Sequence, residues 1–196
     1  EEDEYSIKKI NDISIYVESM DELSNISSYT DSINQILSVL NNLNWDSLVN
    51  EYNNSEKGNR SITQIVRSKV FRLLYSELGY EFTNVDKLSS PRLPTFKIID
   101  NLGVDNRLYY QCFKDDIYIT FTNDNIGFTE NKIFKGLLIR ELINQNALPV
   151  LLTISDEILD AGGYDRVSIT YNKVIKYIEA YQNFINFPIA VIGIHP

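Results

Sequence analysis

Two groups of charged residues in this chain could take part in chemistry. The acidic group consists of Asp115 and Asp116, fourteen or fifteen residues before a Glu-x-Lys motif formed by Glu130, Asn131 and Lys132. Carboxylate oxygens are the ligands that hard divalent cations such as Mg²⁺ prefer. A Glu-x-Lys motif also arises by chance, and a glutamate at the beginning of a helix, where we expect Glu130, can simply complement the helix dipole. Both interpretations of the acidic group stay open.

The basic group lies at the beginning and on the surface of an expected helix. It is the densest basic cluster of an acidic chain and consists of Arg60, Arg67, Lys69 and Arg72. These side chains could contact the phosphates of DNA. They could also form a solvated surface that is paired with nearby acids.

The overall composition narrows the classes of function. The chain has 196 residues and a formal net charge of −9, which opposes non-specific attraction to nucleic-acid backbones. Any contact with DNA must therefore come from a local patch. The single cysteine, Cys112, and the single histidine, His195, exclude a disulfide framework within the chain and an intrachain Cys/His zinc site.

The sequence contains no pattern typical of membrane insertion or secretion. No apolar run approaches the roughly eighteen residues that a membrane span needs, and no signal-peptide pattern opens the chain. We therefore expect an intracellular, cytoplasmic protein without membrane association. Because the first residue is Glu1 rather than Met, we also expect the chain to be a piece of a longer product.

The N-terminal part, residues 1–88, is expected to be helical. Apolar residues recur at helical spacing over 31–44, which predicts a helix there, and Asp46 could cap a short helix after it. Residues 5–29 fit neither the helical nor the strand period, so their structure stays open. The other expected features are a surface loop over 53–60, a helix that begins at Ser61 and ends at Gly79, and a proline-containing connector over 88–94.

The remainder, residues 95–196, is typical of the core of an α/β domain. The expected elements are a strand over 95–99, a hairpin of strands over 108–113 and 117–122, a helix over 131–146, a strand over 149–154, an acidic loop over 156–168, a helix around 174–181 and a strand over 188–194. Strands that alternate with helices at these lengths imply a mixed central sheet flanked by helices. We expect one domain over 1–196.

Four segments of this half carry a resemblance to a known family. They are TFTNDNI (120–126), KGLL (135–138), LPVLLTI (148–154) and FPIAVIGI (187–194). Together with the order of elements, they resemble the restriction endonucleases of the group that contains BamHI and BglII, within the PD-(D/E)XK nuclease fold. The resemblance covers residues 107–196, about half of the chain.

The resemblance implies a magnesium-dependent nuclease site on the hairpin. In that family, acidic side chains hold Mg²⁺, which activates a water molecule beside the scissile phosphate. Matched by position, the acids of the second hairpin strand fall on Thr120 and Thr122, or on Tyr118 and Thr120 in the other register. None of these residues has a carboxylate, so this match predicts a site that cannot cleave DNA.

A different register of the same resemblance restores a catalytic set. It uses Asp116 and Glu130 as Mg²⁺ ligands and Lys132 to position the attacking water. In the first register, the acid of the preceding strand has no clear counterpart either, because Leu108 or Tyr109 occupies the matching region, with Asp105 just upstream.

Three hypotheses about function follow. The first is a nuclease-fold protein that has lost its metal ligands, a pseudoenzyme, and binds DNA or a protein partner. The second is an active Mg²⁺-dependent DNA endonuclease. The third is a non-catalytic α/β interaction domain cut from a larger polypeptide, whose acidic surface would favour a basic or protein partner.

Overall fold

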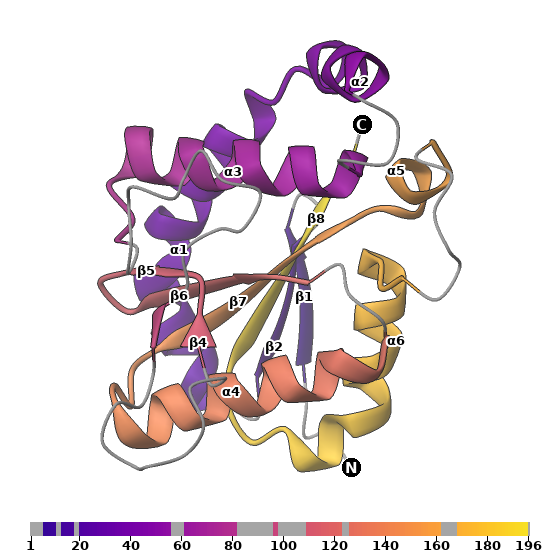
Figure 1. The fold of residues 1–196 in the computed structure, drawn as a ribbon. Coiled ribbons are helices and arrows are strands. Elements are labelled where there is room, and N and C mark those ends of the chain that lie inside the picture. The colour runs from indigo at the N-terminus through magenta and orange to yellow at the C-terminus, as the bar shows by residue number, and fades with distance from the viewer. Residues whose placement is uncertain are drawn as a thin grey trace.

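The computed structural model describes residues 6–10, 13–17, 20–55, 61–81, 96–97, 109–122, 126–161 and 168–195. The strands of its central sheet are β1 (Ser6–Ile10), β2 (Ile13–Val17), β5 (Cys112–Lys114), β6 (Ile117–Phe121), β7 (Leu148–Ile154) and β8 (Ile189–Ile194). They are ordered β1-β2-β8-β7-β6-β5 (Figure 1). A separate pair consists of β3 (Phe96–Lys97) and β4 (Tyr109–Tyr110), which run antiparallel.

Helices cover both faces of the central sheet. They are α1 (Met20–Asn41), α2 (Trp45–Asn54), α3 (Ile62–Leu78), α4 (Thr129–Leu142), α5 (Asp156–Ala161) and α6 (Tyr171–Tyr181), with the 3-10 turns η2 (Ile126–Phe128) and η3 (Gln182–Phe184). The predicted α/β class with a mixed, helix-flanked sheet is therefore confirmed (Figure 1). No helix in the described part of the chain combines the length and the apolar character that a bilayer crossing requires.

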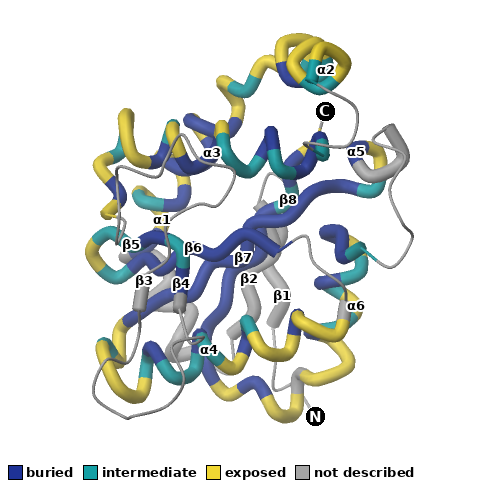
Figure 2. Tube along the Cα trace, in the orientation of Figure 1, coloured by how far each residue is buried: buried dark blue, intermediate teal, exposed yellow. Residues whose placement is uncertain are grey.

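The centre of the sheet is parallel and its borders are antiparallel. Strand β7 pairs in parallel with both β6 and β8, whereas β5 runs antiparallel to β6 and β2 antiparallel to β8. Every residue of β6 and β7 is buried (Figure 2). Strands buried on both faces are almost continuously apolar, which explains why the continuous run at 149–154 predicted β7 correctly.

Alternate residues of the central strands supply two different cores. Ile119 and Leu152 face α1 and α3, where they join a large apolar cluster with residues such as Ile36, Val66 and Phe71. Leu151 and Val191 face the opposite side, in a second cluster with Ile133 of α4 and Val174 and Ile178 of α6. Two helical layers therefore enclose the sheet.

The boundaries of α3 agree with the predictions. Ser61 and Gln64 form a capping box at the beginning of α3, and Gly79 ends this helix in the left-handed conformation at φ 70°. Helix α2 also exists, but its cap is Asn44, whose side chain accepts a hydrogen bond from the Ser47 N–H at 2.8 Å. The prediction that Asp46 caps it was wrong, because Asp46 lies in the first turn.

Three further stretches differ from the predictions. Residues 5–29, left open, supply β1, β2 and the first turns of α1, so the N-terminal part is not only helical and the helix predicted over 31–44 begins earlier. Residues 156–161 of the predicted acidic loop form α5, where Asp156 and Glu157 occupy the first turn that favours carboxylates. Of the loop predicted over 53–60, Asn53 and Asn54 belong to α2, because this helix continues to Asn54. Residues 56–60 and the connector predicted over 88–94 lie outside the described residues.

The strand predicted over 108–113 is divided at Gln111. Its first part is β4 and its second part is β5, and the Gln111 side-chain oxygen accepts a hydrogen bond from the Phe121 N–H of β6. The outer side of β5 is paired with Glu81, just after α3, because Glu81 and Phe113 exchange backbone hydrogen bonds of 2.8 and 3.2 Å.

Helix α4 approaches β7 closely at Gly136. A Cβ atom at this position would lie 2.9 Å from both Cβ and Cγ of Pro149. We expect Gly136→Ala to lower the free energy of unfolding by about 1–2 kcal/mol, because this overlap in the core outweighs the higher helix propensity of alanine. Urea unfolding followed by circular dichroism measures the change. Gly127→Ala is the control, since nothing lies within 4 Å of the place that its added methyl group would take, and Gly136→Ala as stable as wild type would contradict the close approach.

Candidate functional site

Asp116 has a structural position in the turn between β5 and β6. Its Oδ1 accepts a hydrogen bond of 2.7 Å from the Asn144 side chain, which lies in the connection between α4 and β7. Its backbone carbonyl accepts a second bond of 2.7 Å from the Leu148 N–H at the beginning of β7. The preceding residue, Asp115, has a φ of 50°, a conformation that aspartate tolerates better than most residues. Asp116 therefore ties the hairpin turn to the start of the parallel sheet.

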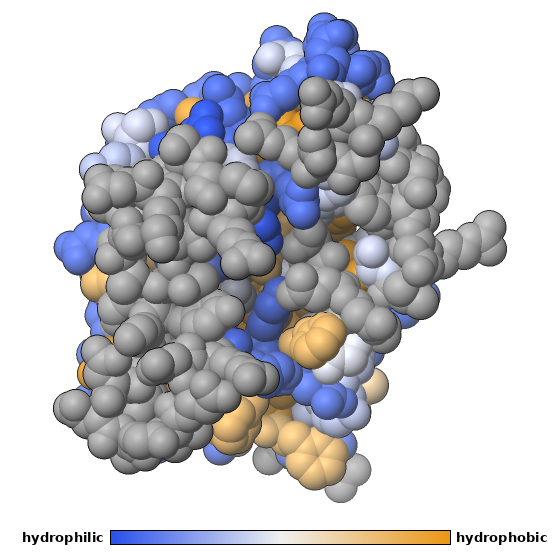
Figure 3. All heavy atoms as spheres, viewed as in Figure 1, coloured by the Kyte–Doolittle hydropathy of each residue, from blue (hydrophilic) through white to orange (hydrophobic). Residues whose placement is uncertain are grey.

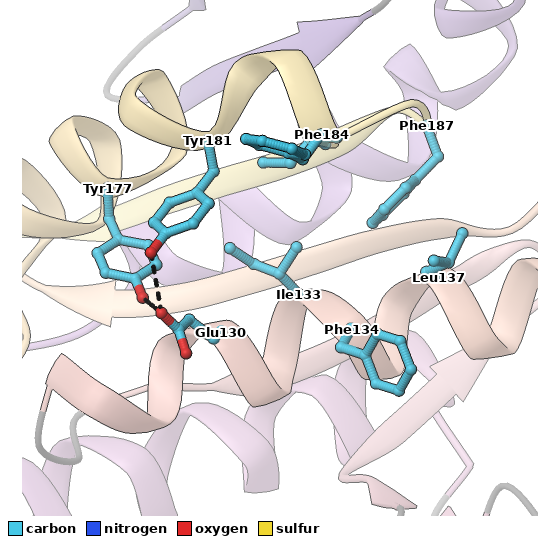
Figure 4. Close-up of a pocket in the computed structure, with 9 residues that line it drawn as sticks. Glu130, Ile133, Phe134, Leu137, Tyr177, Tyr181, Phe184 and Phe187 are labelled. Carbon is cyan, nitrogen blue, oxygen red and sulfur yellow. Dashed lines mark hydrogen bonds between the residues drawn. The ribbon is translucent and has the colours of Figure 1, made fainter.

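Glu130 lies in the first turn of α4 and faces α6. The Tyr181 hydroxyl donates a hydrogen bond of 3.1 Å to Glu130 Oε1, and the Tyr177 hydroxyl donates to the same oxygen (Figure 4). Burial, followed by the hydrogen bond to Glu130, raises the pKa of Tyr177. The expected position of Glu130 at the beginning of a helix is confirmed, and its hydrogen-bond partners come from a helix far along the chain.

Lys132 reaches the opposite end of β6 from Asp116. Its Nζ donates a hydrogen bond of 2.9 Å to the carbonyl of Phe121, the last residue of β6. A strand rises about 3.3 Å per residue, so the five steps from Asp116 to Phe121 span about 16 Å. The structure therefore does not bring Asp116 together with Lys132, and Glu130 points toward α6.

The residues matched to the family's acids are buried hydroxyls. Thr120 and Thr122 are 4% and 1% exposed, and strand alternation places both on the α4 side of β6 together with Tyr118. The Thr122 N–H donates to the Leu152 carbonyl at 2.7 Å, which continues the pairing with β7 and brings Thr122 next to Thr153. The Thr153 hydroxyl is itself buried and has no hydrogen-bond partner among the described residues.

This set of donors does not fit a magnesium ion. Mg²⁺ is held by at least one or two carboxylates in addition to neutral oxygens, and the side chains at these positions of β6 are neutral. Within the described ranges, no three histidine, cysteine, aspartate or glutamate residues are grouped so that they could hold a metal. Thr120 and Thr122 are instead buried on the side of β6 that carries Tyr118, which packs with Ile139 of α4.

The predicted basic group does not share one face of α3. Lys69 and Arg72 are exposed, whereas Arg67 is half-buried and its Nε is buried. At about 100° per residue, Arg67 lies about 140° from Arg72 around the helix axis. Arg60 lies outside the described residues. A single phosphate-contacting stripe along α3 would therefore consist of Lys69 and Arg72 alone.

A pocket of about 340 Å³ lies between α4, α6 and η3. Its lining is mostly apolar and consists of Glu130, Ile133, Phe134, Leu137, Tyr177, Tyr181, Phe184, Ile185 and Phe187 (Figure 4). Phe134 and Phe184 are 56% and 80% exposed, and Figure 3 shows apolar side chains on the surface over α4. This pocket was not predicted from the sequence, although the i, i+4 spacing of Tyr177 and Tyr181 is a signal that both lie on one helix face.

Similarity to known proteins is found among solved structures. Protein-family models and curated proteins give no match. Among solved structures, the fold is similar to that of the restriction endonuclease BglII complexed with a DNA 16-mer, at a TM-score of 0.44 and 11% sequence identity, over 68% of this chain and 53% of that chain. This chain thus corresponds to about half the length of that enzyme. The match falls on the same group of enzymes that the sequence resembles.

The contact between Glu130 and Tyr177 can be tested by titration. We expect Glu130→Gln to lower the pKa of Tyr177 toward the ordinary tyrosine value, because a neutral amide does not repel the phenolate. The ¹³Cζ resonance of labelled tyrosine, followed by NMR against pH, measures this pKa. Tyr118 is the control, since burial raises its pKa too but its side-chain partner is Asn144. An unchanged titration of Tyr177 in the variant would show that the contact is not made in solution.

Proposed function

We propose that this chain is a non-cleaving binding domain whose partner is a protein. The observation that carries the proposal is the burial of two neutral hydroxyls, Thr120 and Thr122, where the resemblance to nucleases calls for metal-binding acids. A hydroxyl supplies no negative charge to a divalent cation. The alternative pair of acids, Asp116 and Glu130, is divided between the hairpin turn and the surface of α4 that faces α6.

The charge distribution favours a protein partner over DNA. The net charge of −9 opposes association with phosphates, and Arg67 lies on a different side of α3 from Arg72. By contrast, Phe134 and Phe184, which line the same pocket beside α4, are both more than half exposed. Aromatic side chains gathered on an accessible surface are typical of protein interfaces.

The absence of cleavage is the first expected outcome. We expect supercoiled plasmid to stay uncut in the presence of millimolar Mg²⁺ or Mn²⁺, because the residues on β6 supply no ligand charge. Agarose electrophoresis of wild type, Asp116→Ala and Glu130→Ala, purified in parallel, gives the answer. Cutting that is lost in either variant would establish the active-endonuclease hypothesis with these acids, and cutting that survives both would place the active site elsewhere. Either result overturns the proposal.

The second expected outcome is a protein neighbour at the aromatic surface. A photoreactive benzoylphenylalanine in place of Phe134 or Phe184 should cross-link one protein in the cells that produce this chain. The same group in place of Ser76, an exposed residue of α3, is the matched control and should not cross-link it. Once identified and purified, the captured protein should bind wild type at least about tenfold more tightly than Phe184→Ser, as expected for an interface aromatic.

Binding of the chain to DNA would contradict the proposed protein partner. We expect no specific binding to a DNA duplex when fluorescence anisotropy is measured at several salt concentrations. If instead the chain binds duplex with a steep salt dependence that is reduced by Lys69→Ala and Arg72→Ala, its partner is DNA and the basic surface of α3 carries the contact.

A further inference from the structure

The pocket between α4 and α6 has a polar end and an apolar end. Glu130, Tyr177 and Tyr181 lie together at one end, and Phe134, Leu137 and Phe187 lie at the other (Figure 4). Such a gradient suits an amphipathic ligand, with an apolar stem and one charged or polar head.

The polar end offers a carboxylate whose orientation is fixed. Both hydroxyl hydrogen bonds to Glu130 end on Oε1, so among the described residues Oε2 accepts none. Two donors on one oxygen hold the carboxylate in place and leave the second oxygen for another donor. Because the carboxylate would repel an anion, the head of a ligand that enters here must be a hydrogen-bond donor, and a cation gains most from it.

Aromatic rings surround the same end. The rings of Tyr177 and Tyr181 are stacked with centroids 4.8 Å apart at 30°, and the ring of Phe184 lies 6.4 Å from that of Tyr181 at 55°. Ring faces attract ammonium and guanidinium groups through their quadrupoles. A carboxylate bordered by aromatic rings therefore recognises an organic cation by two independent interactions.

We propose, building on the proposed protein partner, that this pocket binds a lysine or arginine side chain of that partner. The cationic head would lie between Glu130 Oε2 and the rings of Tyr181 and Phe184, and the methylene stem would pack on the apolar end, against Ile133 and Leu137. A volume of about 340 Å³ is ample for such a side chain. The net charge of −9 favours a basic partner surface and opposes a second copy of this chain as the occupant.

Butylammonium chloride, which reproduces the end of a lysine side chain, is the probe. Butanol has nearly the same shape without the charge. We expect butylammonium to shift the NMR resonances of the Tyr177 and Tyr181 rings and to bind about tenfold more tightly than butanol at low ionic strength. In Glu130→Gln, which keeps a hydrogen-bond acceptor but removes the charge, this preference should disappear.

Glu179→Gln is the matched control. It removes the same charge from an exposed position of α6 outside the pocket lining, so it should leave the preference unchanged. The proposal is overturned if butanol binds as well as butylammonium, if neither binds, or if Glu179→Gln abolishes the preference as Glu130→Gln does. It is also overturned if sedimentation shows that wild type self-associates and Phe184→Ser does not, because a second copy would then fill the pocket.

The failure of this proposal and that of the proposed function are distinguishable. A cross-linked partner that binds wild type, combined with no preference for butylammonium, removes only the assignment of the pocket. A preference for butylammonium in a chain that cleaves plasmid or binds duplex removes only the proposed function.

Discussion

The structure depends on three parallel strands that must be shielded from water on both faces. Strands β6, β7 and β8 are almost wholly buried, and their parallel pairing requires long crossovers, which are supplied by α4 and α6. These crossovers cover one face, and α1 and α3 cover the other. The same burial sets the chemistry of the hairpin, because a position enclosed beneath α4 tolerates the hydroxyl of Thr120 far better than an unpaired carboxylate.

Much of this arrangement could be predicted from local patterns. The apolar run of β7, the helical period of α3 with its Ser61 and Gly79 boundaries, and the alternation of strands and helices each determine one feature of the fold. The failures occur where two signals compete. Residues 5–29 contain both strand and helix spacings because a hairpin and a helix follow one another there, and the acidic side chains that suggested a loop at Asp156 and Glu157 complement the dipole of α5.

The candidate site was less accessible to sequence reasoning, for a physical reason. Spacing along the chain predicts neighbouring side chains only within one helix or strand. Glu130 of α4 instead contacts two residues of α6, Tyr177 and Tyr181, which lie 47 and 51 residues further along the chain. Asp116 and Lys132 are closer in sequence to one another than Glu130 is to either tyrosine, yet a single extended strand separates them. The sequence itself shows that the second hairpin strand, Ile117–Phe121, contains no acidic residue.

The backbone bridge between Glu81 and Phe113 has a consequence for solubility. An uncovered border strand offers free N–H and C=O groups on which other chains can assemble into intermolecular sheets and aggregates. In this protein β5 has only three residues, and its outer side is already engaged by the segment that leaves α3. The hairpin can therefore keep a strongly apolar strand, β6, close to the periphery without offering a template for aggregation.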